Sequence, residues 1–370
     1  MTILVASDKF KGSLSATEAC SAIKKGILEY DNTIKVLTCP MADGGDGSLK
    51  ILEEYESLDS LTVPVYDPLM RPIKAAYKTN KQTAYIEMAA ASGLMLLAKK
   101  ERNCMHTTTF GTGQLILNAI QKGMKNIYLF IGGSATNDGG IGMAAALGYR
   151  FLDQSDKELL PIGQSLYEIA RIDDSNLFFD KNKIIIKVVS DVQNPLTGQQ
   201  GAAWIYGAQK GADIEEIKLL DKGLNTLAKQ LVKQTYPDIN QLSGAGAAGG
   251  LGGGAVAFLG AELISGISFF IQKTALETQL KEVDLVITGE GHLDNQSLAG
   301  KVIHGVCRLA KQHKTPTMIL CGRSEFQQIP SLNIEHIYSI MDISTSEKEA
   351  MEMAYHQLTK LAYQSMPYEK

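Results

Sequence analysis

Short apolar segments that lead into glycine-rich polar loops, and then into helices, recur at both ends of the chain. Ile3 to Ala6 precedes SDKFKGSLS, and Val36 to Cys39 precedes PMADGGDGS. The alternation returns with apolar segments at 284–288, 317–321 and 337–341. Alternating strands and helices form parallel sheets, whose ligand-binding loops gather at the carboxyl ends of the strands. The pattern predicts an α/β fold with a parallel sheet assembled from both ends of the chain.

The middle of the chain follows a different pattern. From Leu61 to Met88, strand-like segments are joined by turns at Asp67-Pro68, Arg71-Pro72 and Asn80-Lys81, which is typical of an antiparallel or mixed sheet. We therefore expect a discontinuous domain of residues 1–62 and 280–370. An inserted mixed α/β domain is expected over residues 63–279.

Several helices are expected from their capping patterns. Ser15 and Glu18 have the spacing of a capping box, as do Ser344 and Glu347 before an expected last helix over 346–365. The amphipathic segment from Asp213 to Lys233 predicts another helix. The segment 244–254 (GAGAAGGLGGG) precedes an apolar run, which favours an ordered loop leading into a helix over a flexible linker.

The segment IGGSATNDGGIGMAAALG, residues 131–148, follows an expected strand at Asn126 to Ile131 and precedes helix-forming residues. Glycine lets a backbone approach a ligand closely, and the N–H groups at a helix start can bind phosphate. A tight turn without a ligand explains the glycines equally well. Neither G-x-G-x-x-G nor the G-x-x-x-x-G-K-[ST] phosphate loop occurs here, so any phosphate site has another form.

Polar side chains are concentrated in the loops expected to follow strands. Carboxylates can hold Mg²⁺ or accept a hydroxyl proton, while lysines and backbone N–H groups neutralise phosphate charge. Each loop alone is weak support, because aspartate is common in glycine-rich turns. Together they favour one site for phosphoryl transfer, from the following residues: Asp8, Lys9, Lys11, Asp43, Asp46, Asn137, Asp138, Asp191, Asn194, Glu290, His292 and Asp294.

Two further residues have open alternatives. Arg71 lies between Met70 and Pro72, where its planar guanidinium could bind a substrate carboxylate or form a surface ion pair. His292 could position phosphate or simply occupy a turn.

Composition restricts location and partners. The net charge of −4 argues against a nucleic-acid-binding surface. The five cysteines include no C-x-x-C pair, which favours reduced thiols and a cytoplasmic location. Residues 243–261 are uncharged but too rich in glycine and alanine for a membrane span, so we expect no membrane partner.

Seven motifs, in order along the chain, resemble the bacterial glycerate kinase family. They are SDKFKGSLSA (7–16), PMADGGDGS (40–48), TTFGTGQLI (108–116), IGGSATNDGGIGM (131–143), SDVQNPLTGQQGAA (190–203), GAGAAGGLGGG (244–254) and VITGEGHLDNQSLAGK (286–301). The resemblance implies ATP-dependent phosphorylation of D-glycerate with Mg²⁺, giving 2-phosphoglycerate in many members. It also implies two α/β domains, one of them flavodoxin-like and built from both chain ends, with the site in the cleft between them.

Site roles follow from the loop chemistry and this resemblance. The expected catalytic residues are Asp191, Lys9 and Lys11, and the expected substrate-binding residues are Asp8, Asp43, Arg71, Glu290 and His292. The expected nucleotide-binding residues are Gly132, Gly133, Ser134, Asn137, Gly139 and Gly140, and the expected metal ligands are Asp138 and Asp46. Asp46 stands where glutamate is frequent in the family, and His292 where arginine is frequent.

Two other functions remain as alternatives. A nicotinamide-dependent dehydrogenase is suggested by the strand, glycine loop and helix followed by Asp153, although the dinucleotide motif is missing from that loop. A sugar-acid sensor would keep the binding site without chemistry. The sequence leaves open which hydroxyl is phosphorylated, how strictly glycerate is preferred, and the oligomeric state.

Overall fold

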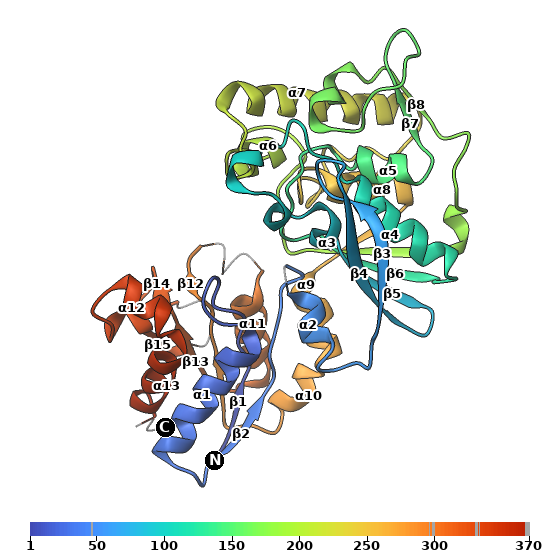
Figure 1. Ribbon diagram of the computed structural model, residues 1–370. Coiled ribbons are helices and arrows are strands. Elements are labelled where there is room, and N and C mark those ends of the chain that lie inside the picture. Colours follow the sequence, from blue (N-terminus) through green and yellow to red (C-terminus); the bar gives the residue numbers. More distant parts are fainter. Residues whose placement is uncertain (46, 296, 298–299, 330–331, 333, 367–370) are drawn as a thin grey trace. The chain divides into compact units, whose positions relative to one another are not determined.

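A computed structural model describes residues 1–370 except 46, 296, 298–299, 330–331, 333 and 367–370 (Figure 1). The chain forms two compact units. Unit 1 comprises Met1–Asp43, Lys50–Glu56 and Ser265–Lys370, and unit 2 comprises Gly44–Leu49 and Ser57–Ile264. The five cysteines are buried and free, and no helix of the described chain is long and apolar enough to cross a membrane.

Unit 1 is built on a five-stranded parallel sheet in the order β15-β13-β11-β1-β2. This is the flavodoxin-like order, with the reversal of strand order between β1 and β11. Asp- and Gly-containing loops leave the carboxyl ends of both strands. The strands are β1 (Thr2–Val5), β2 (Lys35–Thr38), β11 (Leu285–Thr288), β12 (His292–Leu293), β13 (Thr317–Cys321), β14 (Arg323–Ser324) and β15 (Ile334–Ser339).

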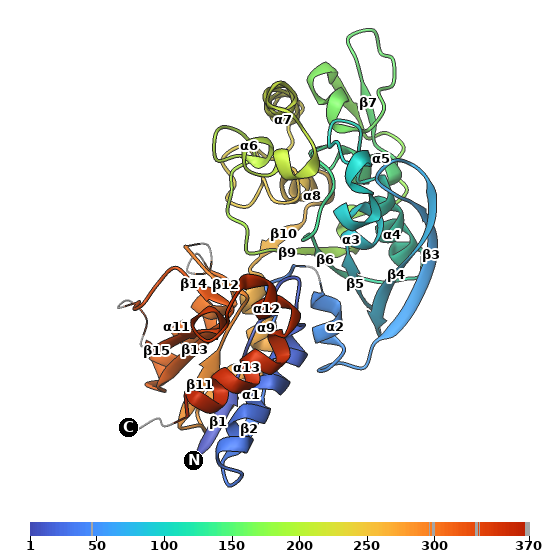
Figure 2. The same cartoon turned by 60° about the vertical axis from the view of Figure 1, so that its left-hand side comes forward.

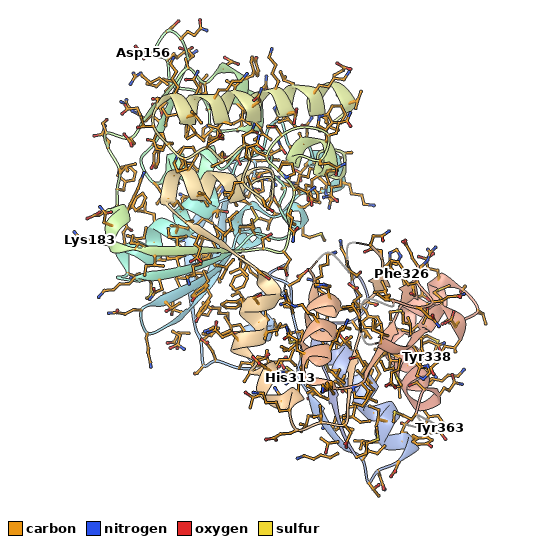
Figure 3. All side chains as sticks on the ribbon, turned by 180° about the vertical axis from the view of Figure 1, so that it is seen from behind. Asp156, Lys183, His313, Phe326, Tyr338 and Tyr363 are labelled. Atoms are coloured by element: carbon orange, nitrogen blue, oxygen red, sulfur yellow. The ribbon has the colours of Figure 1, made fainter. Side chains whose placement is uncertain are left out.

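Helices cover both faces of this sheet (Figures 1 and 2). On one face α1 and α13 lie side by side, and Gly26 allows their close approach because an added Cβ would lie 2.2 Å from the Thr359 carbonyl oxygen. On the other face His313, at the end of α11, pairs with Glu277 of α10 at 3.4 Å (Figure 3). The helices are α1 (Ala16–Tyr30), α9 (Gly266–Lys273), α10 (Leu276–Leu280), α11 (Val302–His313), η6 (Ile340–Asp342), α12 (Glu347–Glu352) and α13 (Ala354–Gln364), and α2 (Ser48–Leu52) begins in unit 2.

One of the two capping predictions is confirmed: Ser15 and Glu18 form a complete capping box at α1. The predicted amphipathic helix is present as α7, and Asp213 caps it. The prediction for the last helix is wrong in two respects: Ser346, not Ser344, accepts the capping N–H, and the helix is divided into α12 and α13 at Met353. The side chain of Glu349 accepts the Thr345 N–H. The helix therefore starts two residues later than the sequence pattern suggests.

Unit 2 contains a six-stranded mixed sheet in the order β10-β9-β6-β5-β4-β3, as the turn pattern predicted. The strands β10, β9, β6 and β5 run parallel to one another. The strand β4 pairs in antiparallel orientation with both of its neighbours, β5 and β3. Segment 244–254 is ordered and enters α8, as expected. The strands are β3 (Asp59–Tyr66), β4 (Pro72–Asn80), β5 (Thr83–Glu87), β6 (Asn126–Phe130), β9 (Ile185–Val189) and β10 (Glu262–Ile264), with the hairpin β7 (Arg150–Leu152) and β8 (Arg171–Asp173).

The core of unit 2 packs helices against this sheet. Ile86, Leu129 and Val188 from three neighbouring strands are fully buried with Leu115 of α4 and Leu251 of α8. The helices are α3 (Ala89–Ser92), η1 (Leu94–Leu96), η2 (Lys99–Glu101), α4 (Phe110–Gln121), α5 (Ile141–Ala146), η3 (Gly163–Glu168), η4 (Lys181–Lys183), α6 (Ala202–Tyr206), η5 (Ala208–Lys210), α7 (Ile214–Lys233) and α8 (Leu251–Leu259).

Candidate functional site

In unit 1 the loops after β1, β2 and β11 are joined by short hydrogen bonds at the carboxyl edge of the sheet. The Asp8 N–H donates to the Gly289 carbonyl at 2.9 Å, and the Met41 N–H donates to the Ser7 carbonyl at 3.0 Å. The Ser7 hydroxyl also donates to the Gly289 carbonyl at 3.0 Å. These loops lie at the reversal of strand order, which is where open α/β sheets bind their ligands.

The carboxylates Asp8, Asp43 and Glu290 come together in these loops. Asp8 is 6% exposed, and burial followed by the nearby charge of Asp43 raises the pKa of Asp8 well above its ordinary value. Lys9 opposes this rise, and its backbone N–H donates to Asp8 Oδ1 at 2.7 Å. Like charges close together favour a shared proton, so this cluster can hold a hydrogen-bond donor as well as acceptors at neutral pH.

Glu290, like Asp8, has a carboxyl group whose pKa is raised well above its ordinary value. Burial raises the pKa of Glu290 to about 7, although Ser297 and Lys301 act in the opposite direction. Its Oε1 is buried and has no hydrogen-bond partner among the residues that the structure describes. A buried polar atom without a partner is a candidate contact for a polar ligand.

The cations predicted for this edge have different environments. Lys9 is half-buried and Lys11 is exposed. His292 lies in β12 with Nε2 3.3 Å from Glu325 Oε1, so a carboxylate already faces its ring. The structure brings Asp8, Lys9, Asp43 and Glu290 to one edge, while the ring of His292 faces Glu325.

In unit 2 the parallel strands β5, β6 and β9 bring three loops to one carboxyl edge. Glu87 ends β5, residues 131–140 follow β6, and Asp191 follows β9. The segment Gly44–Leu49 reaches this edge as well: the Leu49 N–H donates to Glu87 Oε1 at 3.0 Å. The predicted metal ligand Asp46 lies outside the described residues.

Asp191 is half-exposed, in a loop that is anchored on both sides. The Ser190 N–H donates to the Ile264 carbonyl at 3.1 Å. Further along, the Tyr206 hydroxyl donates to Asn194 Oδ1 at 2.7 Å, and the Gly246 N–H donates to the Asn194 carbonyl at 3.0 Å. The loop therefore presents Asp191 from a stiff backbone.

The loop after β6 has an outer part and a buried part. Gly132 and Gly133 are accessible, whereas Asn137, Asp138, Gly139 and Gly140 are buried. An added Cβ on Gly139 would lie 2.6 Å from Leu227 Cδ2, and Gly140 faces Gly254 and Leu251. These two glycines therefore allow close packing inside unit 2, and the expected ligand contact is confined to the outer part of the loop.

Asp138 occupies the position that we predicted for a bound anion. Its Oδ2 accepts the Thr109 N–H and hydroxyl, both at 2.7 Å, and the Gly142 N–H at 3.2 Å. Its Oδ1 accepts the Gly140 N–H at 3.1 Å. The start of α5 is thus capped by this carboxylate, and the arrangement favours an organising role over the predicted metal-ligand role.

Asn137 is fully buried, and within the described part of the chain neither polar atom of its side chain has a hydrogen-bond partner. Buried amides in folded proteins normally have hydrogen-bond partners. This unpaired amide keeps Asn137 among the candidates for contact with a polar ligand.

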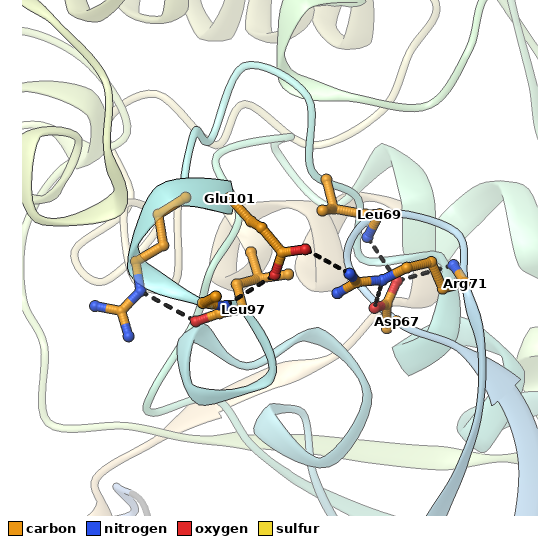
Figure 4. A network of polar contacts seen from close by, with 7 residues as sticks. Asp67, Leu69, Arg71, Leu97 and Glu101 are labelled. Atoms are coloured by element: carbon orange, nitrogen blue, oxygen red, sulfur yellow. Dashed lines mark hydrogen bonds and ion pairs between the residues drawn. The ribbon is translucent and has the colours of Figure 1, made fainter.

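Arg71 is held by two carboxylates, as Figure 4 shows. Its Nε lies 2.5 Å from Asp67 Oδ2, and its Nη1 lies 2.8 Å from Glu101 Oε1. The ion-pair alternative is therefore favoured over the substrate clamp. Asp153, which motivated the dehydrogenase alternative, accepts the Ser155 N–H in the turn between antiparallel strands, so it does not end a parallel strand as a ribose-binding carboxylate does.

Sequence reasoning missed Lys210. Its side chain is 3% exposed, and Nζ donates to the Thr136 carbonyl at 2.7 Å and to Ser134 Oγ at 3.4 Å. Burial lowers the pKa of Lys210 to about 8. In the sequence, Lys210 is recognisable only as a lysine between two segments of small residues. That pattern does not show which loop its ammonium group contacts.

Comparison with known proteins adds a family to this geometry. Residues 3–368 match the model of the glycerate kinase family. A protein of Halalkalibacterium halodurans named glycerate kinase is 39% identical, covering 95% of this chain and 93% of the relative. A protein of Escherichia coli K12 named glycerate 2-kinase is 39% identical, covering 97% and 96%.

A solved structure has the same fold. A crystal structure assigned as glycerate kinase 2 from Salmonella typhimurium LT2 superposes with a TM-score of 0.81 at 38% identity. The similarity covers 98% of this chain and 96% of that one, so both units have counterparts there.

Proposed function

The chain belongs to the glycerate kinase family, and on that premise we propose that it transfers the terminal phosphoryl group of ATP to a hydroxyl group of D-glycerate. The observation that carries the proposal is the similarity over almost the whole chain to relatives named glycerate kinase. The carboxylate-rich and glycine-rich loops at the two sheet edges support it, because phosphoryl transfer depends on positioning and charge stabilisation.

Asp191 is the proposed general base. An alcohol is a weak nucleophile at neutral pH, and a positioned carboxylate that accepts its proton contributes about 10²- to 10⁴-fold in rate. The anchored loop after β9 supports this assignment, because a general base must be held in a narrow range of positions. In the same proposal Gly132, Gly133 and Ser134 contact the nucleotide.

The proposed substrate contacts of unit 1 are Asp8, Asp43 and Glu290, with Lys9 and Lys11 as partners for negative charge. The raised pKa values of Asp8 and Glu290 support contact with a hydroxy acid, since a protonated carboxyl can donate to a substrate oxygen. An ionised pair would instead repel the glycerate carboxylate.

Mg²⁺ is proposed as the partner of ATP. Over the described residues, no three acidic, histidine or cysteine side chains converge as a metal site. Mg²⁺ commonly binds through one or two carboxylates together with substrate phosphates, and the donors of this chain fit that mode. When bound, the ion would supply charge neutralisation at the phosphates.

We propose 2-phosphoglycerate as the product, as the name of the Escherichia coli relative suggests. ³¹P NMR of a reaction with ATP, Mg²⁺ and D-glycerate distinguishes the 2-phospho ester from the 3-phospho ester. Formation of the 3-phospho ester would overturn the regiochemistry alone. If neither ester forms and ATP is unchanged, the result would favour the alternative of a non-catalytic sugar-acid sensor.

A further inference from the structure

Lys210 is a buried cation that contacts the buried residues directly after the accessible Gly132–Gly133 of the loop that follows β6. It ends η5, and its Nζ donates to the Thr136 carbonyl at 2.7 Å and to Ser134 Oγ at 3.4 Å. Burying an ammonium group costs free energy unless it is paired or used. Both of these hydrogen bonds are with a single turn, Ser134–Thr136.

That turn is also where two glycine-rich segments meet. Ser134 Oγ lies 3.0 Å from Thr136 Oγ1 and 3.4 Å from the Ala248 carbonyl oxygen. Gly249, with φ of +71°, approaches so closely that an added Cβ would lie 2.0 Å from the Thr136 carbonyl oxygen. Lys210 therefore holds the same carbonyl oxygen against which segment 244–254 packs.

We propose that Lys210 is a positioning residue, whose ammonium group holds the buried Ser134–Thr136 turn so that the accessible glycines before it, Gly132 and Gly133, can bind the phosphates of ATP, and provides positive charge behind them. This inference rests on the proposed function in one respect, the assignment of Gly132–Ser134 to the nucleotide. Preorganised positive charge near a developing or bound phosphate stabilises it most where water is excluded.

Lys210 should lose its positive charge near pH 8, where the folded protein can be studied. Burial lowers the pKa of Lys210 to about 8, while Cys104 and Asp138 act in the opposite direction. Burial raises the pKa of Cys104 to about 11, where Glu216 adds to the rise, so Cys104 is a neutral thiol near pH 8. Burial also raises the pKa of Asp138, whose oxygens accept four donors.

Two measurable quantities should respond in opposite directions above pH 8. ATP binding should weaken, because the ammonium group loses its charge. The contribution of Lys210 to stability should rise between pH 8 and about 10.5, because the unfolded chain binds more protons there than the folded chain.

The test is calorimetric titration of the full-length protein with ATP and Mg²⁺ between pH 7 and 9.5. Wild type should bind ATP at least about 10-fold more weakly at pH 9.5 than at pH 7, as expected for the loss of one buried positive charge next to phosphate. Lys210→Met should show that weaker binding at every pH. Lys222→Met, which changes an exposed lysine of α7, should behave like wild type. Lys210→Arg should bind ATP equally well across this range, because arginine keeps its charge.

Three results would overturn the inference: a flat wild-type profile, wild-type ATP affinity in a folded Lys210→Met, or an alkaline loss that persists in Lys210→Arg. The wild-type profile alone decides the matter if the variants do not fold. Because binding is measured without turnover, failure of the inference is distinct from failure of the proposed function, which would appear as ATP binding without phosphorylation of glycerate.

Discussion

Thr109 donates both its backbone N–H and its hydroxyl to Oδ2 of Asp138, each at 2.7 Å, where Asp138 is fully buried. Thr109 precedes α4, and its hydroxyl oxygen also accepts the Met143 N–H of α5 at 2.8 Å. The pair thus connects the starts of two helices. The N–H groups that could bind phosphate at α5 are instead used inside the fold.

We expect Asp138→Asn to destabilise the protein by about 2–4 kcal/mol, because an amide cannot accept from all of these donors in a buried site. Thermal unfolding measures the change. Asp153→Asn is the matched control, since Asp153 also accepts backbone N–H groups but in a half-exposed turn. Unchanged stability together with a loss of Mg²⁺ affinity would restore the metal-ligand role.

Gly139→Ala should lower the melting temperature, because the new Cβ would lie 2.6 Å from Leu227 Cδ2 in a backbone with φ of +60°. Gly123→Ala separates the two causes: Gly123 has φ of +83° and nothing within 4 Å of an added Cβ. We expect Gly139→Ala to cost about 1–3 kcal/mol more than the control, as overpacking does. Equal costs would show that Leu227 moves away freely.

Glu290→Gln should change how stability depends on pH. Burial raises the pKa of Glu290 to about 7 from an ordinary 4.5, so the folded chain binds more protons than the unfolded chain between these values. The contribution of Glu290 to stability therefore falls as the pH rises from 4.5 to 7. The variant should be more stable than wild type by about 1–3 kcal/mol at pH 8, with the difference vanishing near pH 4.5. Urea unfolding across this range measures it, and parallel curves would refute the buried-carboxyl account.

Asp191→Asn keeps the shape of the side chain but removes its charge and basicity. We expect kcat to fall by about 10²- to 10⁴-fold, with a much smaller change in the KM for glycerate. Asp59→Asn, an exposed change at the start of β3, should leave both constants unaltered. Near-normal kcat in Asp191→Asn would remove Asp191 from catalysis and make Glu87, at the same sheet edge, the next residue to test.

Regular patterns predicted much of the fold. The alternation of strands and helices predicted that Ile3–Ala6 and Asp284–Thr288 belong to parallel sheet, and β1 pairs in parallel with β11. The amphipathic segment from Asp213 to Lys233 forms α7, as predicted. These features depend on residues close together in the sequence, where propensity and periodicity apply.

The side-chain environments were harder to predict, because distant segments create them. The sequence around Asp138 is equally typical of an accessible ligand loop, and its burial depends on Thr109 and on segment 244–254. Lys210 has the same difficulty: nothing near it in the sequence shows that its ammonium reaches the Thr136 carbonyl. Glu87 was missed because its interaction with the Leu49 N–H joins separate parts of the chain.

Glycerate-dependent release of ADP is the most direct test of the proposed function. Purified protein with ATP and Mg²⁺ should release ADP at a rate that depends on added D-glycerate, with one phosphoglycerate formed for each ADP. Propionate, which has the carboxylate but no hydroxyl group to accept the phosphoryl group, serves as the control acid. An ADP release rate that is the same with and without D-glycerate, at every concentration tested, would contradict the proposed function.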